Sequence, residues 1–85
     1  MKPNKALRDE IFGIIKNQLD NNDPPETKKT YTRLLGLGYS DFQVNQLIGQ
    51  CLAVELFDIL KNKIAFNETR YVKNLMQLPK EPFED

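Results

Sequence analysis

Histidine is absent from this 85-residue chain, and cysteine occurs once, as Cys51. Histidine is the commonest metal ligand and general base in proteins, so its absence removes the usual basis for a metal site or for acid–base catalysis. A single cysteine excludes an intramolecular disulfide and is typical of a reducing compartment. The sequence therefore predicts no catalytic, cofactor-binding or metal-binding residues, and we expect a protein that is not an enzyme.

Long apolar runs and an excess of one charge are also missing. No segment approaches the roughly 18 consecutive apolar residues of a membrane-spanning helix, and the stretch after Met1 lacks the apolar core of a signal peptide. Twelve basic residues balance twelve acidic residues, so no basic patch for a nucleic acid stands out. We expect a cytoplasmic protein with no membrane contact, and nucleic acid is not the expected partner.

The most informative segment that is present runs from Ser40 to Asn62. It has the pattern of one unbroken helix, opened by a capping box of Ser40 and Gln43. Its apolar side chains spread over roughly 240° of the helix circumference, whereas a half-buried helix needs a stripe of only about 100°; they are Val44, Leu47, Ile48, Cys51, Leu52, Val54, Leu56, Ile59 and Leu60. This segment is therefore predicted to be the central helix of a small bundle.

Two shorter helices are expected before the central one. The first is predicted from Lys5 to Asn21 with Asn4 as its N-cap, because apolar residues recur there at helical spacing. The second opens at Asp23-Pro24-Pro25-Glu26, with Asp23 as the predicted cap. It is predicted to end at Leu37-Gly38-Tyr39, where glycine can adopt the left-handed conformation that terminates a helix, with Gly36 as an alternative stop.

A fourth helix is predicted from Asn67 to the residue before Pro79, which stops it. Its inward residues are expected to be Tyr71, Val72, Leu75, Met76 and Leu78, and Phe66 in the preceding connector is expected in the core. The sequence thus predicts an all-α, single-domain bundle of about four helices over residues 1–79, with a long central third helix. Residues 80–85 are expected to form a disordered tail.

One charge, Glu55, falls within the apolar arc of the central helix. A buried carboxylate is either paired with a donor or has a raised pKa. The candidate partners are Arg70, Arg33, Tyr31 and Tyr71. The alternative is that Glu55 takes part in binding or proton transfer, because perturbed carboxylates cluster at functional sites.

Three further features of the sequence each allow two interpretations. Asp58, one turn from Glu55, either shares a site with it or lies in water at the edge of the arc. Cys51 is either a core residue or a nucleophile, although no histidine is present to activate it. The cations of the second helix, Lys28, Lys29 and Arg33, form either a solvated face or a surface for an acidic partner.

Val54, Phe57 and Leu60 widen the apolar arc beyond what three short helices can easily cover. Surplus apolar surface of this kind is typical of a groove for a partner helix or of a homodimer face. The sequence therefore favours a non-catalytic protein-interaction or assembly module that binds a protein partner or a second copy of itself.

The segment Arg33-Leu34-Leu35-Gly36-Leu37-Gly38-Tyr39-Ser40, with the apolar residues that follow it, resembles the first two helices of ubiquitin-associated-like three-helix domains. Its Gly-Tyr-Ser turn also resembles that of some bacterial helix-turn-helix regulators, which implies nucleic-acid binding as the alternative function. In both families the second helix has two to three turns, whereas this one has nearly six. A recognition helix here would also present Asp41 and several amides, with no cation before Lys61, which suits phosphate and guanine contacts poorly.

Over most of its length the chain is similar to a group of small helical bacterial proteins without a known activity. The resemblance rests on Asn22-Asp23-Pro24-Pro25-Glu26-Thr27, Arg33-Leu34-Leu35, Gly38-Tyr39, Glu55-Leu56-Phe57 and Phe66-Asn67-Glu68 with Arg70-Tyr71. Some members of that group carry histidines near the positions of Phe42 and Gln46. This chain has none there, so the resemblance implies no metal site.

Overall fold

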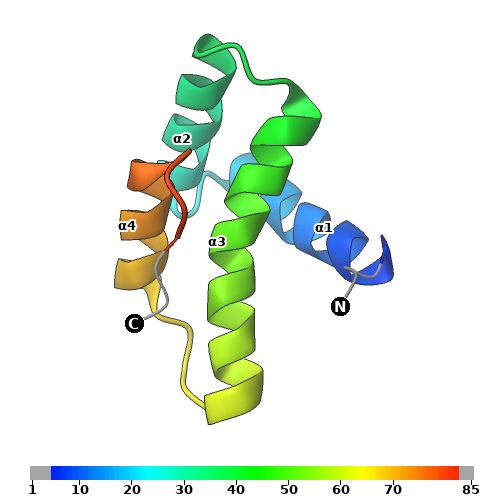
Figure 1. Ribbon diagram of the computed structural model, residues 1–85, viewed down its shortest axis with the longest axis vertical. Coiled ribbons are helices and arrows are strands. Elements are labelled where there is room, and N and C mark those ends of the chain that lie inside the picture. Colours follow the sequence, from blue (N-terminus) through cyan, green and yellow to red (C-terminus); the bar gives the residue numbers. More distant parts are fainter. Residues whose placement is uncertain (1–4, 83–85) are drawn as a thin grey trace.

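Four helices account for most of residues 5–82, the part of the chain that the computed structural model describes. They are α1 (Lys5–Asn21), α2 (Pro25–Gly36), α3 (Asp41–Asn62) and α4 (Glu68–Gln77). No strand occurs within that range. The predicted all-α globule of four helices, with the third one longest, is confirmed (Figure 1). The predicted cap Asn4 and residues 83–85 of the predicted tail lie outside the described residues.

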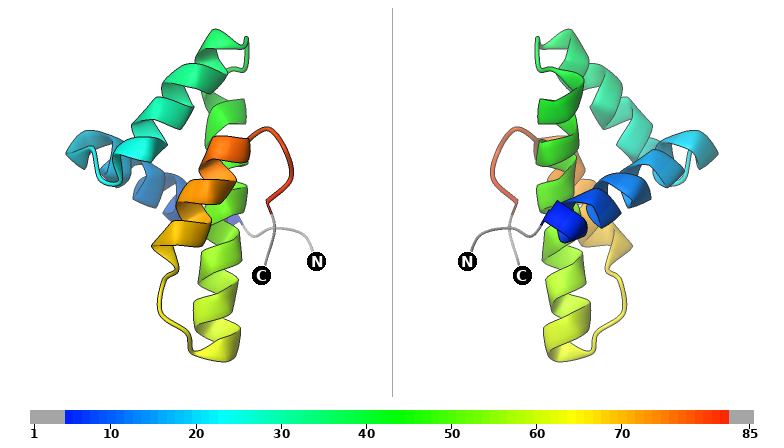
Figure 2. Two further views of the ribbon diagram at one scale, coloured as in Figure 1. Left: turned by 90° about the vertical axis from the view of Figure 1, so that its left-hand side faces the viewer. Right: turned by 90° about the vertical axis from the view of Figure 1, so that its right-hand side faces the viewer.

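α2, α3 and α4 run alternately up and down beside one another, and α1 crosses α3 obliquely (Figures 1 and 2). α3 contacts all three other helices, as predicted for a central helix, and α2 does so too. α1 and α4 lie on different sides of this pair. The C-terminal end of α3 extends past the other helices, accompanied by the connector 63–67 (Figure 2).

α3 begins with the predicted capping box and continues without a break. The Ser40 hydroxyl accepts a hydrogen bond from the Gln43 amide at 3.2 Å, and the Gln43 side chain accepts one from the Ser40 amide at 2.9 Å. Gly49 lies in mid-helix, where a Cβ atom would be 3.2 Å from Cγ2 of Ile11. The missing side chain therefore lets α1 pack closely against α3.

The predicted end of α2 is confirmed, whereas its predicted start is wrong. Gly38 has a φ of 103°, and the amides of Gly38 and Tyr39 bond to the carbonyls of Leu35 and Leu34, which is the Schellman pattern. At the other end Pro24 is the N-cap and no side chain caps the helix. Asp23 precedes the cap by one residue, so its side chain is too early to serve the first turn.

The core is formed by all four helices and the residue that follows α4. Its fully buried apolar members are Ile15, Leu34, Val44, Ile48, Cys51, Leu52, Tyr71, Leu75 and Leu78. Two predictions about the core are wrong. Met76 is 67% exposed, because α4 directs Tyr71, Asn74 and Leu75 inward and position 76 falls on the outer side. Phe66 is 40% exposed and lies at the margin of the core, where it meets the ring of Tyr71 edge-on at a centroid distance of 5.4 Å.

Within residues 5–82, no helix combines the length and apolar character needed to cross a bilayer.

Candidate functional site

Glu55 and Arg70 form an ion pair between α3 and α4 in which both side chains are buried, with 1% and 7% of their surface exposed. Arg70 Nε donates to Glu55 Oε2 at 2.6 Å, and Nη2 donates to Oε1 at 2.9 Å. This two-point geometry matches the fork of a guanidinium to a carboxylate. Arg70 is therefore the candidate partner that the structure brings to Glu55.

Asp58 joins the same cluster. Its Oδ2 accepts a hydrogen bond from Arg70 Nη2 at 2.8 Å, and its Oδ1 accepts one from the side-chain Nδ2 of Asn62 at 2.7 Å. The hydrogen bonds from Asn62 and then from Arg70 lower the pKa of Asp58. Arg70 in turn has a raised pKa, mainly because of its hydrogen bonds to Glu55 and to Asp58.

The connector between α3 and α4 is fastened to this cluster by Asn67. Its backbone amide donates to Glu55 Oε1 at 3.1 Å, and its side chain caps α4 by accepting from the Arg70 amide at 3.0 Å. Glu55 thus receives donors from both the connector and α4. The arrangement holds these charges in a closed set of hydrogen bonds, which suits a structural clamp better than proton transfer.

The other candidate partners of Glu55 are engaged elsewhere. Arg33 donates to the carbonyl oxygens of Leu78 at 2.7 Å and Leu75 at 3.0 Å, so it caps the C-terminal end of α4. The Tyr31 hydroxyl donates to Asp41. The Tyr71 hydroxyl donates to Gln18 Oε1 at 2.7 Å.

Gln18 is a half-buried junction between helices that the sequence did not predict. Its Oε1 accepts from Tyr71 of α4 and, at 2.8 Å, from the hydroxyl of Thr27 of α2. One amide oxygen of α1 therefore joins α2, which packs against α1, to α4, which packs against α2 and α3. Nothing in the spacing of a lone glutamine on α1 distinguishes this role from an exposed amide.

Cys51 is a core residue in the structure. Its side chain is fully buried, and this burial, more than the nearby charge of Glu55, raises the pKa of the thiol to about 12. A thiol with so high a pKa is protonated at neutral pH and is a poor nucleophile.

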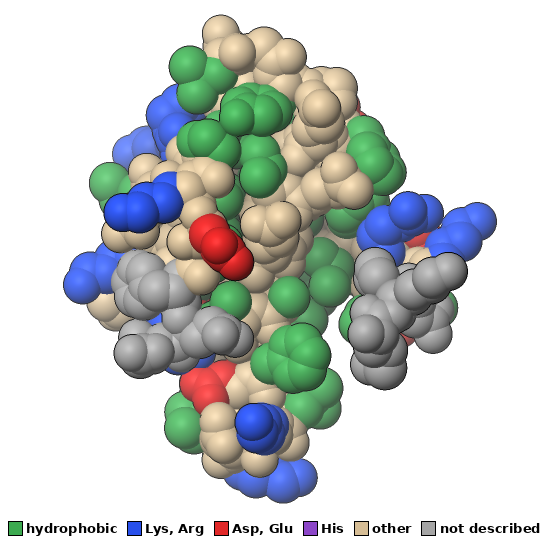
Figure 3. Space-filling model, viewed as in Figure 1, with side chains coloured by type: hydrophobic (Ala, Val, Ile, Leu, Met, Phe, Trp, Pro, Cys, Tyr) green, Lys and Arg blue, Asp and Glu red, His purple; other side chains and the backbone are tan. Residues whose placement is uncertain are grey.

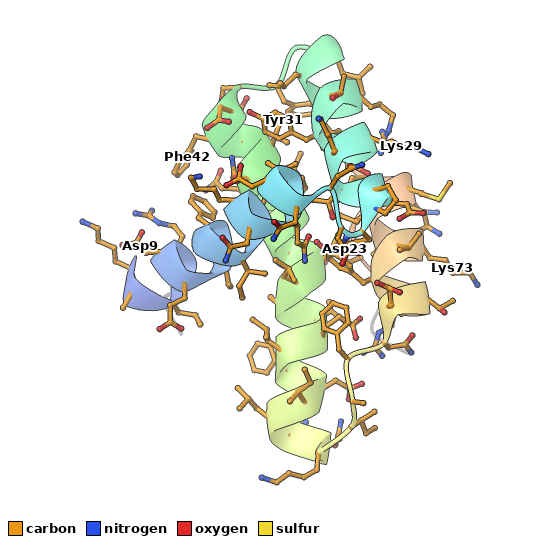
Figure 4. The ribbon with its side chains drawn as sticks, turned by 180° about the vertical axis from the view of Figure 1, so that it is seen from behind. Asp9, Asp23, Lys29, Tyr31, Phe42 and Lys73 are labelled. Carbon is orange, nitrogen blue, oxygen red and sulfur yellow. The ribbon has the colours of Figure 1, made fainter. Side chains whose placement is uncertain are left out.

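The cations of α2 lie beside a shallow hollow of about 460 Å³ lined by Asn22, Pro25, Lys28, Lys29, Thr32 and Arg33. Lys29 of α2 and Lys73 of α4 point outward on the same side of the molecule (Figure 4). Lys28 and Lys29 are exposed, whereas Arg33 is held by α4. Among residues 5–82, no three acidic or cysteine side chains are grouped so that they could hold a metal ion.

Within residues 5–82, one face of α3 is not covered by another helix. We call it the open face and define it by Gln43, Leu47, Gln50, Val54, Phe57 and Lys61, with Leu60 at its edge. Phe57 is 66% exposed and Leu60 75% exposed; Leu47 and Val54 are half-buried, and the remaining members are exposed. The opposite side of α3 is buried, including Val44, Ile48, Cys51, Leu52 and Glu55.

The open face changes character along its length. Near its start a hollow of about 300 Å³ is lined by Tyr39, Gln43, Gln46, Leu47 and Gln50. Towards its end, hydrophobic side chains gather on the lower half of α3, where the helix extends past its neighbours (Figure 3). The predicted interface residues Val54, Phe57 and Leu60 therefore share one accessible surface, and the glutamines were not predicted to belong to it.

No family model, curated protein or solved structure matches this chain.

Proposed function

We propose that this protein is a non-catalytic interaction or assembly module of the cytoplasm that binds a protein partner through the open face of α3. The observation that carries this proposal is the exposure of Phe57 and Leu60, one turn apart on the longest helix. Fully burying such a side chain contributes about 1.5–3 kcal/mol, and most of that is unrealised while two-thirds or more of its surface meets water. A partner on this face would recover it.

The position of these side chains supports the proposal further. They lie on a regular helix rather than in a loop, and the Glu55–Arg70 pair fixes that helix against α4 and the connector. A preformed surface loses little conformational freedom when it binds, which favours affinity. The single cysteine is buried in the core, which fits a reducing cytoplasm.

Nucleic-acid binding by the α2–α3 turn is less well supported. The first turn of α3 presents Asp41, whose carboxylate accepts from Tyr31, and α3 carries no cation before Lys61. Lys29 of α2 points away from this turn (Figure 4). Phosphate contacts need cations beside the groove-reading residues.

Site-specific photo-crosslinking in cells tests the proposal. A photoreactive phenylalanine analogue at Phe57 should give a discrete crosslinked protein, identified by mass spectrometry and reproduced with purified components. The same analogue at Leu37, an equally accessible apolar residue at the end of α2, is the matched control. If position 57 crosslinks no more than position 37, the open face is not a binding surface and the proposal is wrong.

A further inference from the structure

The open face of α3 has the spacing of a coiled-coil seam. Its members follow one another at intervals of four, three, four, three and four residues: Gln43, Leu47, Gln50, Val54, Phe57 and Lys61. The five intervals average 3.6 residues, close to the 3.5-residue repeat that keeps a stripe aligned along a supercoiled helix pair. The stripe is about 27 Å long at 1.5 Å per residue. It therefore fits one further helix lying along α3.

The stripe maps onto itself, position for position, when a second copy runs in the opposite direction. In that register, position n of one helix faces position 104 − n of the other, so Leu47 faces the partner's Phe57. Val54 then faces the partner's Gln50, and the charged Lys61 faces the partner's Gln43. A two-fold axis generates both halves of such an interface from one stripe.

The charges of the chain favour this arrangement over its alternatives. A parallel pair in register would place Lys61 against the partner's Lys61, whereas the antiparallel pair places each lysine beside the partner's uncharged Gln43, whose Oε1 also accepts from the Ser40 amide. Lys61 is the only charge among the six stripe residues, and the whole chain carries no net charge. Two copies therefore approach without long-range repulsion.

We propose that the occupant of the open face is a second copy of this chain, bound as a two-fold antiparallel pair of α3 helices with Leu47 packed against the partner's Phe57. This inference rests on the proposed function and gives it a particular partner. The seam spans only about two and a half heptads and contains two glutamines, so dissociation constants in the micromolar range are expected.

Sedimentation equilibrium from micromolar to submillimolar concentration tests the pairing. We expect a monomer–dimer equilibrium in which Phe57→Gln weakens dimerisation by about tenfold or more, because each dimer contains two such anchors. Leu60→Gln should weaken it less. Met76→Gln, which changes an equally exposed apolar residue on α4, should leave the dissociation constant within about a factor of two. Glutamine is a good helix former, so these variants keep the helix.

Engineered disulfides test the direction of the pair. A mixture of the Gln43→Cys and Lys61→Cys proteins should form a disulfide between the two under mild oxidation, whereas Lys61→Cys alone should not. The buried native Cys51 gives the background in the unsubstituted protein. Efficient crosslinking of Lys61→Cys alone would mean parallel packing and would overturn the inference.

The result also separates this inference from the function on which it rests. A protein that stays monomeric at every concentration, or a dimer that is indifferent to Phe57→Gln, refutes the two-fold pair. If position 57 then crosslinks an identified second protein in cells, the open face still binds a partner and only its identity was wrong. If it crosslinks nothing, both proposals fail.

Discussion

Arg70 binds Glu55 at two points, from Nε to Oε2 at 2.6 Å and from Nη2 to Oε1 at 2.9 Å. The two residues are 15 positions apart and belong to different helices, so this contact sets the position of α4 on α3. The stability that this pair provides depends on the comparison made. A buried ion pair is strongly stabilising relative to a protein in which one of the two charges has lost its partner, and much less so relative to one in which both charges are replaced by apolar residues.

Arg70→Met should lower the free energy of unfolding by about 3–5 kcal/mol, because it leaves Glu55 charged and buried without its partner. The double variant Glu55→Leu/Arg70→Met should lose much less than the sum of the two single variants, since neither charge is then stranded. Urea unfolding followed by circular dichroism measures all three.

Lys16 and Asp20 provide the control for this prediction. They form an ion pair of similar length, 2.8 Å, but both side chains are exposed. Exposed pairs contribute little because water and salt screen them, so Lys16→Met should leave the urea midpoint nearly unchanged. Single-variant losses that simply add in the Glu55/Arg70 double variant would show that the two residues are not coupled.

The helices themselves could be predicted from the sequence because their signals are local. The capping box at Ser40, the glycine stop at Gly38 and the run of apolar residues between Val44 and Ile59 each involve residues within a few turns of one another. These choices are governed by backbone hydrogen bonds and side-chain spacing. The first helix could likewise be placed from its apolar period.

The contacts between helices could be predicted only in part. The sequence indicates that Glu55 needs a partner, because this charge falls within an apolar arc. It does not indicate which partner, because the position of Arg70 depends on the path of the non-helical connector 63–67 between α3 and α4. The same connector leaves Phe66 outside the core. Gln18 gave no signal, because an amide that joins three helices has the same local sequence pattern as one in water.

The open face shows why the apolar periodicity of α3 alone could not predict which of its sides is buried and which is accessible. The broad arc of α3 combines a buried side with a second, accessible side that includes Val54 and Phe57. The glutamines that continue this side looked like ordinary surface residues, and their heptad spacing mattered only once the structure placed no helix over them.

Stability should fall at alkaline pH in two stages. Burial raises the pKa of Cys51 from 9.0 to about 12 and that of Tyr71 from 10.0 to about 12. Each folded-state pKa lies above the unfolded one, so the stabilisation is complete below the unfolded pKa and is lost as the pH rises towards the folded pKa. The loss should begin near pH 9 and steepen above pH 10, by up to about 1.4 kcal/mol per pH unit for each group.

Urea unfolding between pH 8 and 11.5 can assign the two stages. Cys51→Ala should remove the loss that begins near pH 9, whatever it does to the stability at neutral pH. Tyr71→Phe should reduce the steepening above pH 10 and leave the part due to Tyr31, whose pKa is raised by its hydrogen bond to Asp41. A profile that keeps its onset in Cys51→Ala would mean that the thiol does not titrate differently in the folded and unfolded states.

Two helical glycines should respond differently to alanine. A Cβ at Gly13 of α1 meets nothing within 4 Å, whereas one at Gly49 of α3 lies 3.2 Å from Ile11 Cγ2. Gly13→Ala should therefore raise the unfolding free energy by about 0.5–1 kcal/mol through helix propensity. Gly49→Ala should gain less or lose stability, and Gly49→Val should be clearly destabilising because α1 must move away. Thermal unfolding distinguishes these cases, and equal gains at both positions would contradict the close packing of α1 on α3.

Gln18 should matter more to stability than an amide on α1 ordinarily does. Its Oε1 accepts from the hydroxyls of Thr27 and Tyr71, and the side chains of both donors are buried. Gln18→Leu leaves two buried donors without this acceptor, which should lower the free energy of unfolding by about 1–3 kcal/mol for each donor. Tyr71→Phe removes the hydroxyl itself, so no donor is left unpaired at that position, and it should lower the free energy of unfolding by about 1 kcal/mol. In the Tyr71→Phe background, Gln18→Leu should cost distinctly less than in the natural protein, because one of the two stranded hydroxyls is gone. Asn17→Leu, at an exposed neighbouring position, is the control and should change the urea midpoint little. If Gln18→Leu behaved like Asn17→Leu, the three-helix junction would contribute nothing to stability, and α1 would be held by its packing against α2 and α3.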